Sequence, residues 1–310
     1  MIHTAQFYMK FRESERLFLE NKYKDNIFNI YSKINNIYEC RGIAINYIAT
    51  FMNEYTMFLT IDFIKLLNKS LISDNDIEVI ENEITNFKID IINNGSIETI
   101  LTRIDYRIDI EVSPNDRETL LYLYNKTLNK YGFKKKFNEY DTTIYFNSKS
   151  IQSKVYDKEA ERKFKKEAIQ EYEKDILRFE VALRNQHLNY NKRAYNMSKD
   201  INTYLKDETC KKYMKKNLEV FLFKGDYHTI YKAKKIINSS ELNINEKEAT
   251  IEFIKYISNN GVTKAQSKYS KYKFKKYTAI LVELNINPIL IPKNLEGAPS
   301  FIKNPFNLSA

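Results

Sequence analysis

The chain has 310 residues, of which 43% are hydrophobic, and its 50 lysines and arginines outnumber 40 acidic residues. This length accommodates two domains and this hydrophobic content supplies a core, which excludes an intrinsically disordered chain. No uncharged apolar run is long enough to cross a bilayer, and the charged N-terminus is unlike a signal peptide, so we expect no membrane partner. The two cysteines, Cys40 and Cys210, lie far apart, which is typical of a reduced, cytoplasmic protein.

The excess of positive charge lies in the C-terminal third of the chain. Residues 1–200 carry 31 basic and 30 acidic side chains, whereas residues 201–310 carry 19 and 10. A coding bias toward lysine would spread the lysines evenly, so this asymmetry favours a region that binds a polyanion. A lysine-rich helical surface that only faces water is the alternative.

The first 200 residues mix strand-like and helix-like patterns. Ile2–Lys10 and Thr56–Ile61 are expected to be strands, and Glu78–Ile92 has the apolar spacing of an amphipathic helix. Thr102–Val112 is the clearest strand of this part, because apolar residues alternate with charged ones along its whole length.

Ser113 and Pro114 indicate that a helix begins directly after this strand. Serine is a favoured helix cap, and proline is favoured at the first helical position. We expect the helix to run to about Tyr131 and to end at Gly132, because glycine commonly terminates helices.

Asp141–Arg184 contains three more strand-like runs. Thr142–Asn147 and Ser153–Lys158 are joined by a polar turn, and Ile176–Arg184 follows a helical spacer. The resulting order of strands and helices predicts an α+β fold, with an antiparallel sheet and helices on one side of it.

The polar faces of these strands carry groups that suit phosphodiester chemistry. Side chains two apart in a strand share a face, so Tyr156 and Lys158 are expected to point the same way. Glu180 lies on the polar face of the last strand. A tyrosine, a lysine and a carboxylate suit cleavage of a phosphodiester by a tyrosine hydroxyl.

The segment that begins TIYFNSKSIQSKVYDKEAERK and ends LRFEVALR resembles the central region of rolling-circle replication initiators from filamentous phages and small plasmids. The gene II/X type is the nearest pattern: a strand, N/G-S-K-S, a strand that ends in Y-D-K-x-x-E, and then L-R-x-E-V. The similarity is clear over Arg103–Arg184. It implies a metal-dependent, origin-specific DNA endonuclease that nicks one strand and rejoins it through a 5′-phosphotyrosine intermediate.

The resemblance implies a role for two residues of the V-Y-D-K motif. Tyr156 is expected to be the nucleophile, and Tyr145 in the preceding strand is the runner-up among 24 tyrosines. Lys158 would stabilise the phenolate or the scissile phosphate. A lysine at a strand end that only contacts water is the alternative.

The strand from Arg103 to Glu111 places alternating charges on one face, and its other face is apolar. We expect Asp105, Asp109 and Glu180 to share one Mg²⁺ or Mn²⁺ ion through oxygen ligands, and the resemblance to initiators with an R-x-D strand supports this. A solvated face of alternating charge is the alternative. The chain has three histidines and no His-x-His pair, so it lacks the histidine metal site of many rolling-circle nickases.

From about residue 200 the pattern is helical almost without interruption. We expect a nicking domain over residues 1–200 and a helical DNA-binding region over residues 201–310. Part of that region has the spacing of a helix-turn-helix, with helices Glu246–Ser258, Val262–Lys268 and Lys271–Leu284; a helical hairpin for protein contact is the alternative. Six lysines of the second and third helices are expected to bind DNA: Lys264, Lys268, Lys271, Lys273, Lys275 and Lys276.

Together these features predict an initiator of rolling-circle DNA replication in a phage or plasmid. Its partners would be the origin DNA, a host polymerase that extends the free 3′-hydroxyl and a host helicase, and a homodimer is compatible with the sequence. No glycine-rich phosphate loop is present, so we expect no nucleotide cofactor. Two rivals stay open: a replication or copy-number regulator that binds DNA without nicking it, and a relaxase or transposase with the same tyrosine chemistry.

Overall fold

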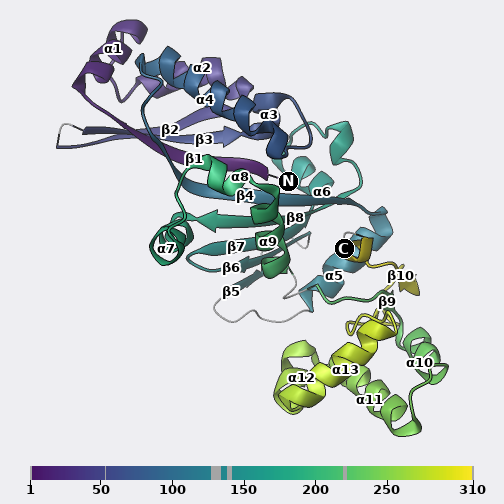
Figure 1. Cartoon of the computed structure of the whole chain (residues 1–310). Helices are drawn as coiled ribbons and strands as arrows, with labels where there is room; N and C mark the ends of the chain where they lie inside the picture. Colours follow the sequence, from purple (N-terminus) through teal and green to yellow (C-terminus); the bar gives the residue numbers. More distant parts are fainter. Residues whose placement is uncertain (1, 53, 127–133, 138–141, 219–221, 309–310) are drawn as a thin grey trace. The chain divides into compact units, whose positions relative to one another are not determined.

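The computed structural model describes residues 2–52, 54–126, 134–137, 142–218 and 222–308. Its elements confirm the predicted α+β class, with an antiparallel sheet followed by a helical C-terminal region (Figure 1). The chain forms two compact units that follow no single cut in the sequence, and the boundary near residue 200 stays a prediction. Unit 1 comprises Met1–Ile108, Lys149–Gln152 and Glu180–Lys215, and unit 2 comprises Asp109–Ser148, Ser153–Phe179 and Lys216–Ala310.

Unit 1 is built on an antiparallel sheet in the order β2-β3-β1-β4. Its strands alternate as predicted: Ala5, Phe7 and Met9 of β1 are buried, whereas Gln6 and Tyr8 between them are half-buried. The first strand and the two later ones were expected, and β2 was not. The bounds are β1 (Ile2–Phe11), β2 (Ile43–Phe51), β3 (Glu54–Asp62) and β4 (Thr99–Glu111).

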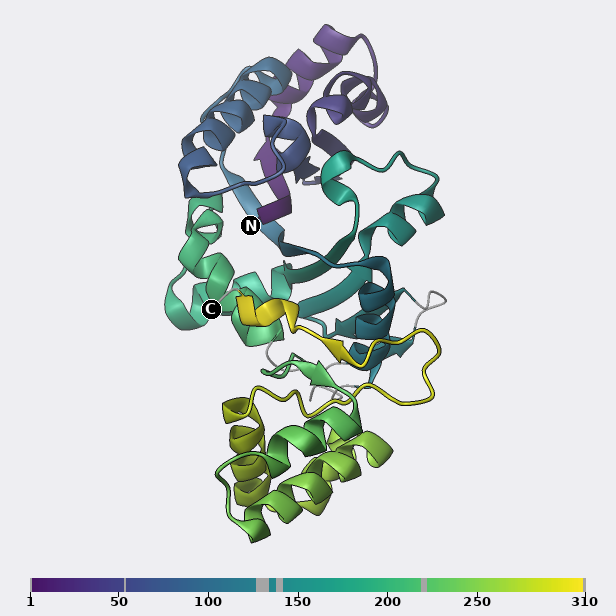
Figure 2. The ribbon, with the colours of Figure 1, turned by 90° about the vertical axis from the view of Figure 1, so that its right-hand side faces the viewer.

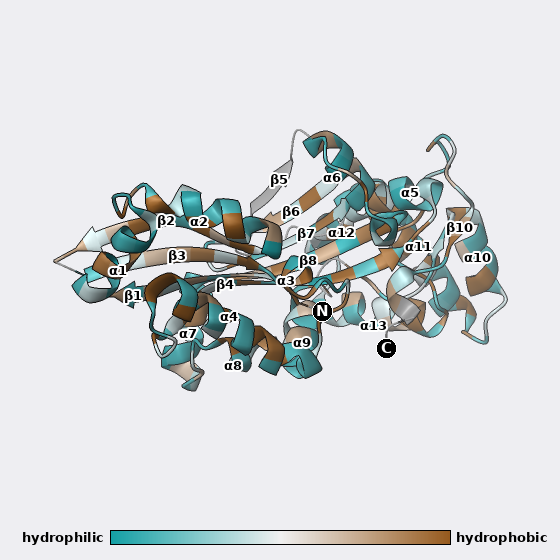
Figure 3. Cartoon of the chain, turned by 90° about the horizontal axis from the view of Figure 1, so that it is seen from above, coloured by the Kyte–Doolittle hydropathy of each residue, from teal (hydrophilic) through white to brown (hydrophobic). Residues whose placement is uncertain are grey.

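Four helices lie on one side of these strands (Figures 1 and 2). Ile80, Ile84, Phe87 and Ile91 form the buried stripe of α4, at the spacing of three and four residues that one helix face requires. Hydrophilic and hydrophobic residues alternate around α2 and α4, as expected of helices with one face on a sheet (Figure 3). The bounds are α1 (Glu13–Tyr23), α2 (Ile30–Tyr38), α3 (Phe63–Leu67) and α4 (Ile77–Ile92).

Strands β6, β7 and β8 come from the segment Asp141–Arg184 that carries the predicted nucleophile. The third predicted strand has the predicted bounds, Ile176–Arg184, and every residue from Leu177 to Leu183 is buried, so β8 is covered on both faces. From β4 onward the strand order is β8-β7-β6-β5, and β4, β7 and β8 each have residues in both units. The bounds are β5 (Lys134–Phe137), β6 (Thr143–Asn147), β7 (Ile151–Asp157) and β8 (Ile176–Arg184).

The helix after β4 begins as predicted, because the Ser113 side chain accepts a hydrogen bond from the backbone of Asp116 at 3.3 Å. It ends at Asn125, earlier than expected, and Gly132 lies outside the described residues. No helix in the described part of the chain is long and apolar enough to span a membrane. The remaining helices before the C-terminal region are α5 (Pro114–Asn125), α6 (Lys158–Lys165), α7 (Asn185–Tyr195), α8 (Ile201–Leu205) and α9 (Asp207–Leu218).

The predicted helix-turn-helix segment is present in unit 2, where α10 to α13 form one helical cluster (Figure 2). Its second helix has the predicted bounds, and Gly261, at φ +81°, separates it from the first. The first helix begins at Ile244 rather than Glu246, because Asn243 caps it. The bounds are α10 (Ile230–Asn238), α11 (Ile244–Asn260), α12 (Val262–Lys268), α13 (Lys271–Glu283), β9 (Tyr227–His228) and β10 (Phe301–Ile302).

Candidate functional site

The junction between β7 and α6 carries the predicted nucleophile. Tyr156 is the next-to-last residue of β7 and is only 4% exposed. Asp157 ends the strand and caps the helix, since its side chain accepts a hydrogen bond from the backbone of Ala160 at 2.9 Å. Lys158 therefore begins α6, and the prediction that it shares a strand face with Tyr156 is wrong.

Lys154 is the lysine that does share a strand face with Tyr156. It precedes Tyr156 by two residues in β7, and its Nζ lies 4.8 Å from the centroid of the Tyr156 ring. A cation at that distance is attracted to the face of the ring. The spacing K-x-Y was the signal that could have pointed to Lys154 from the sequence.

Lys158 is buried among carboxylates in the first turn of α6. Its Nζ lies 2.5 Å from Glu161 and 3.4 Å from Glu173, and the residue is 4% exposed. Burial lowers the pKa of Lys158 below its usual value, although the hydrogen bond to Glu161 opposes that effect. Glu173 is held in turn by Arg162, at 2.7 Å.

Arg117 of α5 connects this junction to the end of the sheet. Its Nε donates to Asp157 at 2.7 Å, and its two terminal nitrogens donate to Glu159 at 2.7 Å and to Asp175 at 3.2 Å. The Arg117 side chain is 5% exposed, so one buried guanidinium is the shared partner of three carboxylates. It fixes both the turn after Tyr156 and the residue that precedes β8.

The charged face of β4 is partly covered: Arg107 is buried, Arg103, Asp105 and Asp109 are half-buried, and Glu111 at the end of the strand is exposed. Arg107 is 2% exposed and Arg178 is 1% exposed. In unit 2, Arg178 holds Asp109 through two hydrogen bonds of 2.6 and 2.8 Å. Buried charges need such partners, because an unpaired one would carry the full cost of dehydration.

The three predicted metal ligands are each in a different setting. Asp109 is paired with Arg178 in unit 2; in unit 1, Asp105 accepts a hydrogen bond from Arg103 at 2.7 Å, and Glu180 is 3% exposed. Within the described residues, no group of three or more histidine, cysteine, aspartate or glutamate side chains is arranged to hold a metal ion. The side chains as they lie do not form a ready ligand set, and the metal site stays a prediction.

The six predicted DNA-binding lysines lie on α12 and α13, and all but Lys276 are exposed. Lys276 is paired with Glu246 at 2.8 Å. Lys268 lies over the ring of Tyr256, 4.0 Å from its centroid, and Tyr256, Lys264 and Lys268 help to line a shallow groove of about 370 Å³. Five of the six lysines are therefore exposed, and their role in DNA binding stays a prediction.

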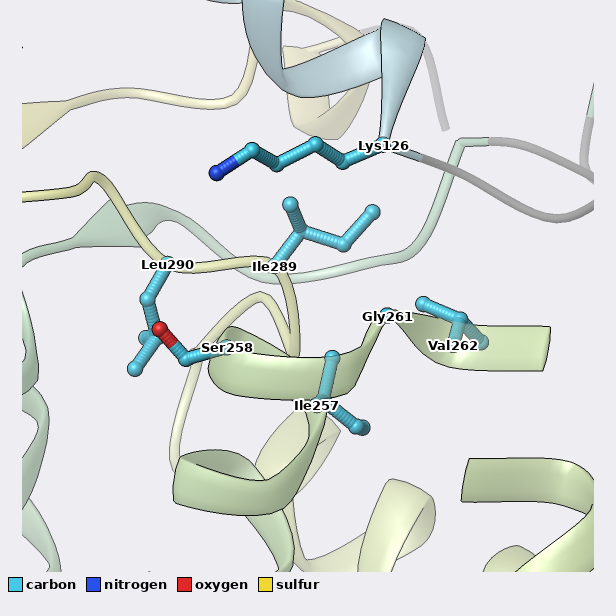
Figure 4. Close-up of a pocket in the computed structure, with 7 residues that line it drawn as sticks. All are labelled: Lys126, Ile257, Ser258, Gly261, Val262, Ile289 and Leu290. Carbon is cyan, nitrogen blue, oxygen red and sulfur yellow. The ribbon is translucent and has the colours of Figure 1, made fainter. Parts of the chain in front are cut away.

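A second hollow in unit 2 lies where α11 meets α12 (Figure 4). Its lining includes Lys126, Gly261 and Ile289, and its volume is about 10 Å³. That volume has room for about one water molecule, so we assign this hollow to packing rather than to ligand binding.

Comparison with known proteins connects this geometry to replication. Residues 63–203 match the phage CRI family, described as the N-terminal part of a replication-associated protein; the match covers somewhat under half of the chain and includes Tyr156, Lys158 and all three predicted metal ligands. No curated protein matches the chain. The helix-turn-helix segment lies outside the matched residues. The family match supports a replication-associated role with DNA as the partner, that of a phage replication initiator.

Proposed function

We propose that this chain nicks one strand of DNA at a replication origin and later rejoins it, with Tyr156 as the nucleophile. The family match over residues 63–203 carries the proposal, because it covers the whole segment from β4 to β8 around Tyr156. The 3′-hydroxyl left by the nick would serve a host polymerase as a primer, while a host helicase separates the strands.

The proposed step is an attack by the Tyr156 hydroxyl oxygen on the phosphorus of a phosphodiester. The new bond joins tyrosine to the 5′-phosphate, the bond to the 3′-oxygen breaks, and that oxygen takes up a proton as the phenol loses one. Rejoining is the reverse, with a 3′-hydroxyl as the attacking group. The phosphotyrosine bond conserves the energy of the phosphodiester, so no nucleotide is consumed.

Two lysines are candidates to stabilise the charge of this reaction. Lys154 is supported by its position 4.8 Å from the Tyr156 ring. Lys158 keeps the role that the family motif implies for it, but it would first have to leave Glu161 and Glu173. Comparing Lys154→Met with Lys158→Met in single-turnover nicking separates these two assignments.

Mg²⁺ or Mn²⁺ stays part of the proposal as the expected cofactor at Asp105, Asp109 and Glu180. A bound divalent ion would polarise the oxygens of the scissile phosphate. For Asp105 and Asp109 to become ligands, their bonds to Arg103 and Arg178 would have to open or be shared. Nicking assays in EDTA, Mg²⁺ and Mn²⁺ test this expectation.

The basic surface of α12 and α13 is proposed to bind duplex DNA at the origin. Lysines that neutralise phosphates release counterions, so the affinity should fall steeply as salt rises. Replacing Lys271, Lys273 and Lys275 together by glutamine should weaken binding and reduce the salt dependence. If the salt dependence stays the same, these helices do not contact phosphates.

The experiment that tests the proposed function is a nicking assay on the supercoiled replicon that encodes this chain. Wild type is expected to relax it and to form a covalent protein–DNA adduct, and Tyr156→Phe is expected to do neither. An adduct that survives in Tyr156→Phe but not in Tyr145→Phe would transfer the role to Tyr145. Tight DNA binding without relaxation in wild type would favour a regulator, and cleavage only at transfer origins or terminal repeats would favour a relaxase or transposase.

A further inference from the structure

Unit 1 contains a groove on the side of its sheet opposite to α1–α4. It has a volume of about 370 Å³ and is lined by residues of β1, β2, β3 and β4 and by Arg184 and Asn185. We propose that this groove binds single-stranded DNA by stacking bases on Tyr47 and Phe58, an inference that rests on the proposed function because it takes DNA as the substrate. The groove is a binding surface additional to the basic helices and to the residues of the nicking step.

The aromatic side of the groove owes its shape to a bulge in β2. Ile45 and Tyr47 each pair with a residue of β3, whereas Asn46 between them is an extra residue in β2. The extra residue shifts the alternation of the strand, which turns both Asn46 and Tyr47 toward the groove and leaves Ile45 and Ile48 buried. Bulges are enriched next to functional sites, where they redirect side chains in this way.

Three aromatic rings lie next to one another across the sheet. Tyr47 and Phe58 are stacked, with centroids 4.3 Å apart and planes at 22°, and Tyr8 follows 6.0 Å beyond Phe58. Tyr47 is 52% exposed, so much of its ring can be reached by a ligand. Nucleobases of any identity stack on such rings, and exposed aromatic rings are typical of proteins that bind single strands.

Polar and positively charged groups surround these rings. Arg103 donates one hydrogen bond to Asp105, which holds its guanidinium in place without using all five of its N–H groups. Asn46 donates to Thr60 at 2.9 Å, so its amide is also held at the groove. Among the described residues that line the groove, two are arginines and none is acidic. Guanidinium groups bind phosphates, and amides bind the edges of bases.

This combination favours a single strand over a duplex or a protein. In a duplex the faces of the bases are stacked inside and cannot reach Tyr47, whereas a single strand exposes them. A protein ligand offers no phosphates to Arg103 and Arg184. After the nick, strand separation by the proposed host helicase exposes a single strand, so the proposed function supplies the ligand that the groove fits.

The test uses the full chain with Tyr156→Phe, so that binding is measured without covalent chemistry. A fluorescein-labelled oligothymidylate of about 15 nucleotides is titrated by fluorescence anisotropy, and a duplex of the same length is titrated in parallel. Adding Tyr47→Ala is expected to weaken single-strand binding by about fivefold or more, and to leave duplex binding unchanged. Tyr31→Ala is the matched control, because Tyr31 is also exposed in unit 1 but lies on α2.

Photocrosslinking with an oligonucleotide that contains 5-iododeoxyuridine provides a second readout, with Tyr47 or Phe58 as the expected attachment sites. The proposal is overturned if Tyr47→Ala and Tyr31→Ala bind the single strand equally well, if Tyr47→Ala weakens duplex binding to the same extent, or if the crosslinks map outside the groove. If the chain with Tyr156 intact forms no covalent adduct with origin DNA while single-strand binding still depends on Tyr47, the nicking function is refuted and the groove remains a binding site.

Discussion

Replacing Arg117 by methionine removes the guanidinium that three carboxylates share and keeps most of the side-chain volume. Asp157, Glu159 and Asp175 then lose the guanidinium to which all three are bonded. Removing one partner of a buried ion pair costs roughly 3–5 kcal/mol. The Asp157 and Glu159 side chains are 17% and 20% exposed and Asp175 is 48% exposed, so water can partly hydrate all three. We therefore expect the lower end, a loss of about 3 kcal/mol in the free energy of unfolding.

The assay is urea unfolding followed by far-UV circular dichroism, with the slope of the transition compared between variants. Arg41→Met is the matched control: Arg41 is 55% exposed and lies 3.4 Å from Glu83, so its loss should cost less than about 1 kcal/mol. If Arg117→Met loses no more stability than Arg41→Met, the reasoning that the buried Arg117 guanidinium stabilises the chain through its three carboxylate partners is wrong.

Three further predictions address the junction and the C-terminal region. Burial alone would raise the pKa of Glu173, but Arg162 and Lys158 outweigh it and lower this pKa from 4.5 to about 2. In thermal melts Glu173→Gln should therefore be less stable than wild type above pH 4.5, and the difference in stability should vanish as the pH falls toward 2. A difference that stays constant with pH would contradict this. Asn243→Ala removes the cap of α11 and should cost about 1 kcal/mol in urea unfolding, whereas no loss would exclude a capping role. Gly225 has φ +90°, and a Cβ added there would lie 2.4 Å from the Ile286 backbone, so Gly225→Ala should lower the free energy of unfolding by more than about 1 kcal/mol. The control is Gly297→Ala, because nothing lies within 4 Å of a Cβ added at Gly297. Equal urea midpoints for the two variants would refute this.

Strands with regular alternation could be predicted from the sequence, and strands with a local irregularity could not. β8 has the predicted bounds because apolar residues alternate from Leu177 to Leu183 without a break. In β2 the extra residue Asn46 shifts the pattern, so the strand shows no continuous alternation. At the end of β7 the aspartate at 157 was a readable helix-cap signal, and it explains why the strand stops before Lys158.

The settings of the charged candidate residues could not be predicted, since they depend on partners far away in the sequence. Asp109 and Arg178 are 69 residues apart, and no local pattern indicates that they form a buried pair. Alternating charges in β4 have the same pattern whether the face is solvated or covered. The position of Lys154 beside Tyr156 could have been predicted, because the two residues are two apart in a predicted strand and therefore share a face.

Mapping the covalent attachment site tests the central claim most directly. The chain is incubated with single-stranded DNA from the origin of its replicon, the adduct is digested with nuclease and protease, and the modified peptide is sequenced by mass spectrometry. The account predicts one modified residue, Tyr156, carrying a 5′-linked nucleotide, with no such peptide from Tyr156→Phe. A nucleotide on another tyrosine would contradict the assignment of the nucleophile. Wild type that cleaves the origin DNA without any tyrosine-linked nucleotide would contradict the phosphotyrosine mechanism itself.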